Sequence, residues 1–177
     1  MKYLNYLLLL CSLTLAGCES MTVSQCQVAD WGRVGFNDAA AGVRETRIAD
    51  YNEDCGKVGI QPNQRAYRQG WDAGIGRYCT AANGWREGTL GNSYKAVVCQ
   101  GQAGFETFSH YLDAGLRVHQ TRTKMNQKTE EINRLKKRLD ESTSDKDKHR
   151  LREELSDLNY AQRELESLLY RQKRQAP

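Results

Sequence analysis

Six cysteines are the residues of this chain most able to form new covalent or metal bonds. Two lie near the start, Cys11 and Cys18, and four lie 20 to 29 residues apart further along: Cys26, Cys55, Cys79 and Cys99. A structural zinc site usually combines closely spaced cysteine pairs with one another or with histidines. The four later cysteines form no Cys-x-x-Cys pair and have no histidine among them. Their spacing therefore favours disulfides over zinc.

Cys18 ends a segment with the features of an exported lipoprotein. Lys2 gives a positive start, residues 4–15 are mostly apolar, and the run is shorter than the ~20 residues of a membrane-spanning helix. Leu15-Ala16-Gly17-Cys18 resembles the lipobox of bacterial lipoproteins, in which the cysteine is lipidated and the new terminal amine is acylated, as with palmitate. We therefore expect residues 1–17 to be a signal peptide and Cys18 to hold the chain on a membrane. An ordinary secretory signal, with Cys18 left as a thiol, is the alternative.

The residue after Cys18 bears on the compartment. An aspartate there favours the inner membrane in Gram-negative lipoproteins, and this chain has Glu19 instead. The sequence therefore favours the outer membrane, with the chain facing the periplasm. In that oxidising compartment the four later cysteines should form two disulfides, for which three connectivities exist. We favour Cys26–Cys55 with Cys79–Cys99, because sequential pairs close the shorter loops.

The residues that could act as acids, bases or nucleophiles are scattered. His110, His119 and His149 belong to no recognisable Ser/His/Asp or metal motif. Asp38 and Asp72 occupy related places in a repeated pattern and could form a carboxylate pair, although capping or bridging a helix contact is the commoner role. We therefore predict no catalytic residue, no metal and no cofactor. A small periplasmic hydrolase is one alternative.

Three tryptophans suggest a second alternative, a module that binds cell-wall glycan or polysaccharide. The rings of Trp31, Trp71 and Trp85 could stack on sugars. Aromatic residues at helical spacing are more often part of a core, so the glycan-binding surface stays the alternative.

Composition divides the chain into parts. Residues 26–116 hold the tryptophans and almost all the glycines, and residues 19–116 carry a net charge of −2. Residues 117–177 have no glycine, cysteine or tryptophan and a net charge of +5. We therefore predict a lipid-anchored linker over 18–25, a disulfide domain over 26–116, a coiled coil over 117–172 and a basic tail over 173–177.

The disulfide domain is predicted to be mainly helical. One pattern recurs at Gly35–Ala39, Gly70–Gly74 and Gly84–Gly88: a glycine, an aromatic residue, two mostly polar residues and a small residue. Small residues four apart lie on one helical face and let another backbone approach. Asp30 is placed to cap the first helix. Residues 94–98, Tyr-Lys-Ala-Val-Val, form the one strand-like stretch, within a short β/turn excursion.

The coiled coil has two apolar seams with heptad spacing. They are Met125, Ile132, Leu135 and Leu139, and then Leu151, Leu155, Leu158, Leu165 and Leu169. The seams are out of phase, and Ser144 with Asp147 resembles a helix cap between them. Folding the chain near residue 143 would set Ile132 opposite Leu155 and Met125 opposite Gln162. This favours an antiparallel helical hairpin; a straight helix that forms a parallel dimer or trimer is the alternative.

Residues 26–116 resemble the bacterial lipoproteins that carry the uncharacterised domain of unknown function 2799. The matching residues are Trp31, Gly35, Asp38, Gly42, Cys55, Gly59, Pro62, Tyr67, Gly70, Gly74, Tyr78, Cys79, Gly84, Gly88, Gly91, Tyr94, Val98, Cys99, Phe108, Tyr111 and Gly115. The resemblance implies a lipoprotein with a stapled domain. It implies no known reaction.

These observations together favour a non-enzymatic, lipid-anchored envelope protein. Its partners would be the membrane, through lipidated Cys18, and a protein that docks on the coiled coil, or a second copy of the chain. Nucleic acid is excluded as a partner because the chain is exported and its basic tail residues alternate with eleven acidic ones.

Overall fold

A computed structural model describes residues 20–177, and over that range the chain is helical with no strand. The mainly α fold is thus confirmed. Residues 1–19, which include the predicted signal peptide and Cys18, lie outside the described range. The chain forms two compact units, one ending at Gly74 and the other beginning at Ile75. The boundary predicted at residue 116 from composition does not separate two structural units, because it falls inside one continuous helix, Phe105–Glu141.

Over residues 20–74 the first unit contains four helices and a 3-10 turn: α2 (Val23–Val28), α3 (Trp31–Ala40), η2 (Glu45–Arg47), α4 (Ile48–Gly56) and most of α5 (Gln64–Tyr78). Asp30 caps α3, as predicted, by accepting the backbone N–H of Arg33 at 3.1 Å. The Cys26–Cys55 disulfide joins α2 to α4. It is one of the two sequential pairs favoured from the spacing.

Helices α3 and α5 touch through their backbones. A Cβ added at Gly35 would collide with the carbonyl of Tyr67, and one added at Gly70 would collide with the carbonyl of Gly32. A Cβ at Gly74 would likewise meet the carbonyl of Phe36. The recurring glycine pattern therefore marks a stripe along which no side chain fits between the two helices.

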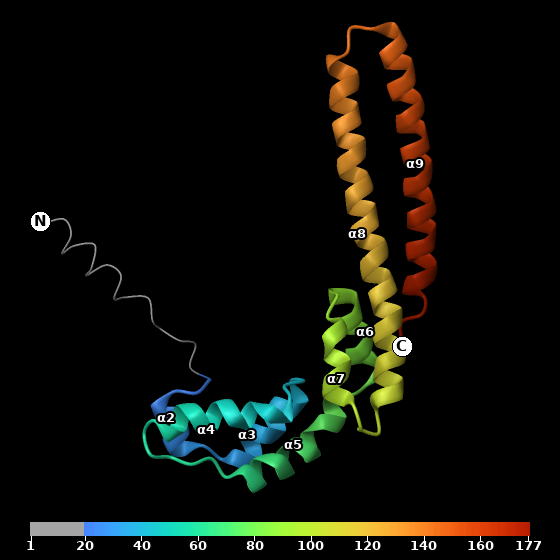
Figure 1. Ribbon diagram of the computed structural model, residues 1–177. Helices are drawn as coiled ribbons and strands as arrows, with labels where there is room; N and C mark the ends of the chain where they lie inside the picture. The colour runs from blue at the N-terminus through green and yellow to red at the C-terminus, as the bar shows by residue number, and fades with distance from the viewer. Residues whose placement is uncertain (1–19) are drawn as a thin grey trace, which may run out of the picture. The chain divides into compact units, whose positions relative to one another are not determined.

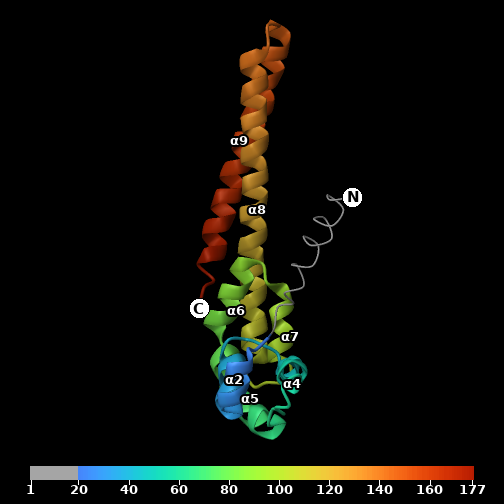
Figure 2. The same ribbon diagram turned by 90° about the vertical axis from the view of Figure 1, so that its left-hand side faces the viewer.

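The second unit begins with the last turn of α5 and continues with five elements: α6 (Ala81–Leu90), η3 (Ser93–Lys95), α7 (Ala96–Cys99), α8 (Phe105–Glu141) and α9 (Asp145–Lys173). The Cys79–Cys99 disulfide holds α7. Helix α6 packs along the first part of α8, and α9 returns beside α8 (Figures 1 and 2). Here too glycines make the contact: a Cβ at Gly84 would collide with the carbonyl of Phe108, and one at Gly88 with the carbonyl of Leu112.

The two units repeat one plan. In each, a cysteine precedes a glycine-bearing helix, and that helix is followed by a glycine with positive φ, Gly42 (70°) or Gly91 (85°), which only glycine adopts without strain. A 3-10 turn follows, then a short helix holding the second cysteine, and then the long helix on which the first one packs. The loose sequence repeat thus corresponds to a duplicated helical motif.

The predicted strand over residues 94–98 is wrong. These residues form η3 and the first turns of α7. Val98 and Cys99 are both buried while Val97 is half exposed, whereas a strand would bury alternate residues. The disulfide of Cys99 and the absence of a neighbouring strand among residues 20–177 let local helical hydrogen bonds prevail over β propensity.

The antiparallel hairpin is confirmed. Helix α8 ends at Glu141 and α9 begins at Asp145, where Ser144 accepts the backbone N–H of Asp147. The predicted seams meet in a core made of Ile132, Leu135, Leu151, Leu155 and Leu158. Further from the loop the side-chain amide of Gln162 donates to Thr129 at 3.3 Å, one helical turn from the predicted Met125 pairing.

Gly84→Ala should destabilise the protein by about 1–3 kcal/mol, because the added methyl collides with the α8 backbone. Gly76→Ala is the matched control, since Gly76 is also helical and a Cβ there meets nothing within 4 Å. That substitution should raise stability by about 0.5–1 kcal/mol. Urea unfolding followed by tryptophan fluorescence measures both, and equal effects of the two substitutions would contradict the close-packed stripe.

Candidate functional site

The three histidines do not form a site. His110 is exposed and its ring lies against Tyr111, His119 lies beside the Thr89 carbonyl at 3.3 Å, and His149 pairs with Glu153 on the surface of α9. Within residues 20–177 no group of three histidine, cysteine or acidic side chains is arranged to hold a metal ion. In the same range no helix is long and apolar enough to cross a membrane.

The proposed carboxylate pair is not assembled. Asp72 is exposed on α5, whereas Asp38 lies in a polar cluster inside the first unit. The hydroxyls of Tyr51 and Tyr67 donate to the same Asp38 oxygen at 3.0 and 2.8 Å. Asp38 is thus engaged by two phenols whereas Asp72 faces solvent, so the two acids do not share one environment.

The Asp38 cluster is built to bridge three helices. Tyr51 comes from α4 and Tyr67 from α5, both are buried, and their rings lie edge to face with centroids 6.0 Å apart. Burial, reinforced by the Asp38 carboxylate, raises the pKa of Tyr67 far above its usual range, and burial and Asp38 also raise the pKa of Tyr51. Both phenols therefore remain hydrogen-bond donors, a structural role. Tyr51 was not identified from the sequence, because this residue lies outside the repeated glycine pattern.

Glu87 is the counterpart of Asp38 in the second unit, since each follows the contact glycine of its helix by three residues. Glu87 is buried and accepts hydrogen bonds from Asn92 at 2.8 Å and Arg86 at 3.0 Å. Burial alone would raise the pKa of Glu87, but these hydrogen bonds outweigh it and lower the pKa. The carboxylate is thus held ionised by fixed partners, whereas a general acid requires a raised pKa.

The predicted aromatic surface is not formed. Trp31 and Trp71 are 9% and 5% exposed, and the Trp71 indole donates to the Val43 carbonyl at 2.9 Å. Trp85 is half-buried. Trp31 and Trp71 belong to the core of the first unit, as helical spacing of aromatic residues usually indicates, and their faces are not available to a sugar ring.

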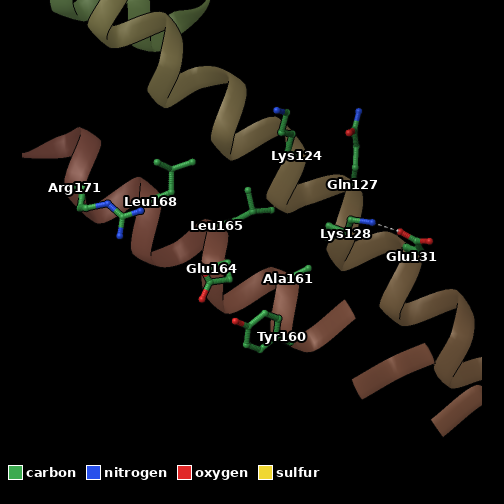
Figure 3. Close-up of a pocket in the computed structure, with 10 residues that line it drawn as sticks. All are labelled: Lys124, Gln127, Lys128, Glu131, Tyr160, Ala161, Glu164, Leu165, Leu168 and Arg171. Carbon is green, nitrogen blue, oxygen red and sulfur yellow. Dashed lines mark hydrogen bonds and ion pairs between the residues drawn. The ribbon is translucent and has the colours of Figure 1, made fainter. Parts of the chain in front are cut away.

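A groove of about 640 Å³ lies between α8 and α9. Its floor includes Ala161, Leu165 and Leu168 of α9, and Figure 3 shows both leucines extending toward α8. These three residues recur at spacings of four and three, so they form one helical stripe. Leu165 belongs to both this stripe and the hairpin seam, so the apolar face of α9 is wider than the seam alone. The heptad pattern did not reveal this wider face.

Charged side chains flank this groove, which we call the hairpin groove. Lys124, Lys128 and Glu131 lie on the α8 side, and Glu164 and Arg171 on the α9 side. Lys128 is paired with Glu131 at 2.9 Å, but both are partly exposed, so the pair is weak and can be exchanged for others. An apolar floor between charged flanks is the surface that accepts an amphipathic helix.

The packing of the hairpin explains why a groove exists at this level. Polar residues enter the seam here, and the carbonyl oxygens of Gln162 and Gln172 are buried without a hydrogen-bond partner among the described residues. Nearer the loop the seam is entirely leucine and isoleucine. The two helices are therefore tightly joined near their connection and less well packed toward their other ends.

A comparison with protein families identifies the domain. Residues 30–117 match the model of a family described as protein of unknown function (DUF2799). This part of the chain belongs to that family. The resemblance to the domain of unknown function 2799 is thereby confirmed. The match begins after Cys26, covers the rest of the duplicated motif and stops within α8, before the hairpin loop. Neither a curated protein nor a solved structure matches the chain.

Asp38→Ala should destabilise the first unit by about 1–3 kcal/mol, because the buried Tyr67 hydroxyl loses its acceptor. The exposed Asp72→Ala is the control and should change stability by less than about 0.5 kcal/mol. In a double-mutant cycle with Tyr67→Phe, the two effects should be non-additive by about 0.5–3 kcal/mol. Thermal unfolding measures all four proteins, and strict additivity would show that the cluster is not energetically coupled.

Proposed function

We propose that this chain is a non-enzymatic, lipid-anchored protein of the cell envelope, whose helical hairpin binds an amphipathic α-helix of a protein partner. The observation that carries the proposal is the hairpin groove. The anchor rests on Leu15–Cys18, and the location, the outer membrane facing the periplasm, rests on Glu19. The two disulfides suit that oxidising compartment.

The dimensions of the groove suit a helix. From Ala161 to Leu168 the apolar stripe spans eight residues, a rise of about 10 Å or two helical turns. A partner helix would present apolar residues at positions i, i+3 or i+4, and i+7 over the same distance. Added to α8 and α9, it would complete a three-helix arrangement and bury the half-exposed leucines.

The charges around the groove select the flanks of the partner helix. Lys124 and Lys128 on the α8 side favour acidic residues on the flank that faces them, whereas Glu164 on the α9 side favours a basic residue on the other. Complementary charges of this kind fix orientation and partner choice more than affinity. Glu131 on the α8 side and Arg171 on the α9 side carry the opposite signs, so the groove suits an amphipathic helix whose edge facing α8 is mainly acidic and whose edge facing α9 carries both signs.

Lipidation is tested by the mass of the mature protein. The purified chain should begin at Cys18 and carry three acyl chains, because two or more chains are needed for firm anchoring. Cys18→Ser should release the protein from the membrane fraction. Cys11→Ser, which changes only the predicted signal peptide, is the control and should leave mass and fractionation unchanged. An unmodified Cys18 in the intact mass would refute the anchor.

Partner binding is tested by a photoreactive amino acid placed at Leu168 in living cells. Leu168 lines the groove, so irradiation should give an adduct whose other half maps, by mass spectrometry, to an amphipathic helix of a different protein. The same photoreactive residue at the exposed Arg163, on the opposite face of α9, is the control and should give about tenfold less adduct. Leu168→Glu, with helicity unchanged by circular dichroism, should abolish an adduct formed from position 161. Adducts only with a second copy, or equal adducts at both positions, would contradict the proposal.

A further inference from the structure

We infer that the first unit is held directly against the phospholipid headgroups, with the carboxyl end of α4 facing the bilayer and almost no linker between. The inference rests on the proposed lipid anchor at Cys18 and deepens it. Within the lipid-anchored linker predicted over residues 18–25, it treats residues 20–25 as attached to α4.

The attachment begins at the first described residue. The backbone N–H and the hydroxyl of Ser20 both donate to one oxygen of Asp54 at 2.6 Å, and the Lys57 ammonium donates to the other oxygen at 2.8 Å. Hydrogen bonds from Lys57 and then Ser20 hold the pKa of Asp54 well below its usual range, so the acceptor stays ionised at neutral pH. We call this arrangement the Asp54 clamp.

The residues that follow are fixed as well. Thr22 caps α2 by a capping box with Gln25, and the Cys26–Cys55 disulfide then joins α2 to the same helix that carries Asp54. The chain is therefore tied to α4 at two points, through Ser20 and through Cys26. No residue from 20 to 28 is left to act as a spacer.

Covalent geometry limits how far the lipid can lie from the clamp. Only Glu19 separates Cys18 from Ser20, and consecutive Cα atoms are 3.8 Å apart, so the two Cα atoms lie within about 8 Å of each other. Since the acyl chains of Cys18 enter the bilayer, Ser20 and Asp54 must lie at the level of the headgroups. A spacer of twenty or more flexible residues would leave the orientation free; two residues do not.

The surface around the tied segment suits that location. Val58, which follows Lys57, is 42% exposed, and Val23 of α2 is 47% exposed. Exposed valines fit the boundary between headgroups and acyl chains, where apolar groups gain from partial burial. Residues 20–74 have a net charge of −1. Contact with the bilayer therefore depends on the tether and on apolar surface and should be insensitive to salt.

Fluorescence quenching tests the inference. The mature lipidated protein with Val58→Cys, labelled with an environment-sensitive fluorophore, is placed in vesicles of phosphatidylethanolamine and phosphatidylglycerol that contain a headgroup quencher. We expect at least twofold quenching, unchanged at 0.5 M salt. Twelve Gly/Ser residues inserted between Glu19 and Ser20 should remove the quenching while the protein still floats with the vesicles.

A matched pair of variants tests the clamp itself. Asp54→Ala frees Ser20 and should reduce the quenching at position 58, whereas Asp50→Ala, an exposed carboxylate of the same helix, should not. Absence of quenching in a protein that floats would overturn this inference alone. Failure to float would overturn it together with the lipid anchor, so the two failures are distinguishable.

Discussion

Close approach of helix backbones at glycine is the constraint on which both units depend. Where Gly35 meets Tyr67 and Gly84 meets Phe108, the helices are so near that no side chain can lie between them. Such a contact buries little apolar area, so a small unit needs other stabilisation as well. Each unit has a disulfide of 20 to 29 residues, which by the chain-entropy account contributes about 3 kcal/mol. The glycine stripe and the disulfide thus stabilise each unit together, and both are present in each copy of the duplicated motif.

The buried carboxylates follow from the same geometry. Each unit places an acidic side chain three residues after the contact glycine, beside the glycine stripe, since Gly88 again meets α8 one residue after Glu87. Asp38 satisfies two buried phenols, and Glu87 satisfies Asn92 and Arg86. A buried charge with all its partners in place rigidifies a core, whereas an unpartnered one would be costly. These acids therefore serve the fold, although their position in the repeat had suggested chemistry.

Much of this could be predicted from local patterns. The caps at Asp30 and Ser144 rest on signals within one turn of the chain, the hairpin on the heptad spacing of its two seams, and the disulfides on the order of the cysteines, and each is present. The failures share a different cause. Residues 94–98 have β propensity but no strand to pair with, and Tyr51 joins Asp38 only because α4 folds back over α3. Such long-range placement leaves no periodicity in the sequence.

The hairpin helices are joined by side chains, whereas the helices of the domain before them touch through their backbones. In the hairpin the joining side chains are large and aliphatic near the loop, but toward its other end Thr121, Lys128 and Gln162 replace the leucines that would complete the seam. Filling those positions with apolar residues would make a more stable hairpin, since each buried leucine contributes about 1.5–3 kcal/mol. A seam that gives up this stability along one stretch, beside the partly exposed stripe of Ala161, Leu165 and Leu168, has the form that the proposed third helix requires. Polar residues at seam positions also fix the register of a coiled coil at a cost in stability, so it is the apolar stripe beside them, which register alone does not require, that supports the proposed partner helix.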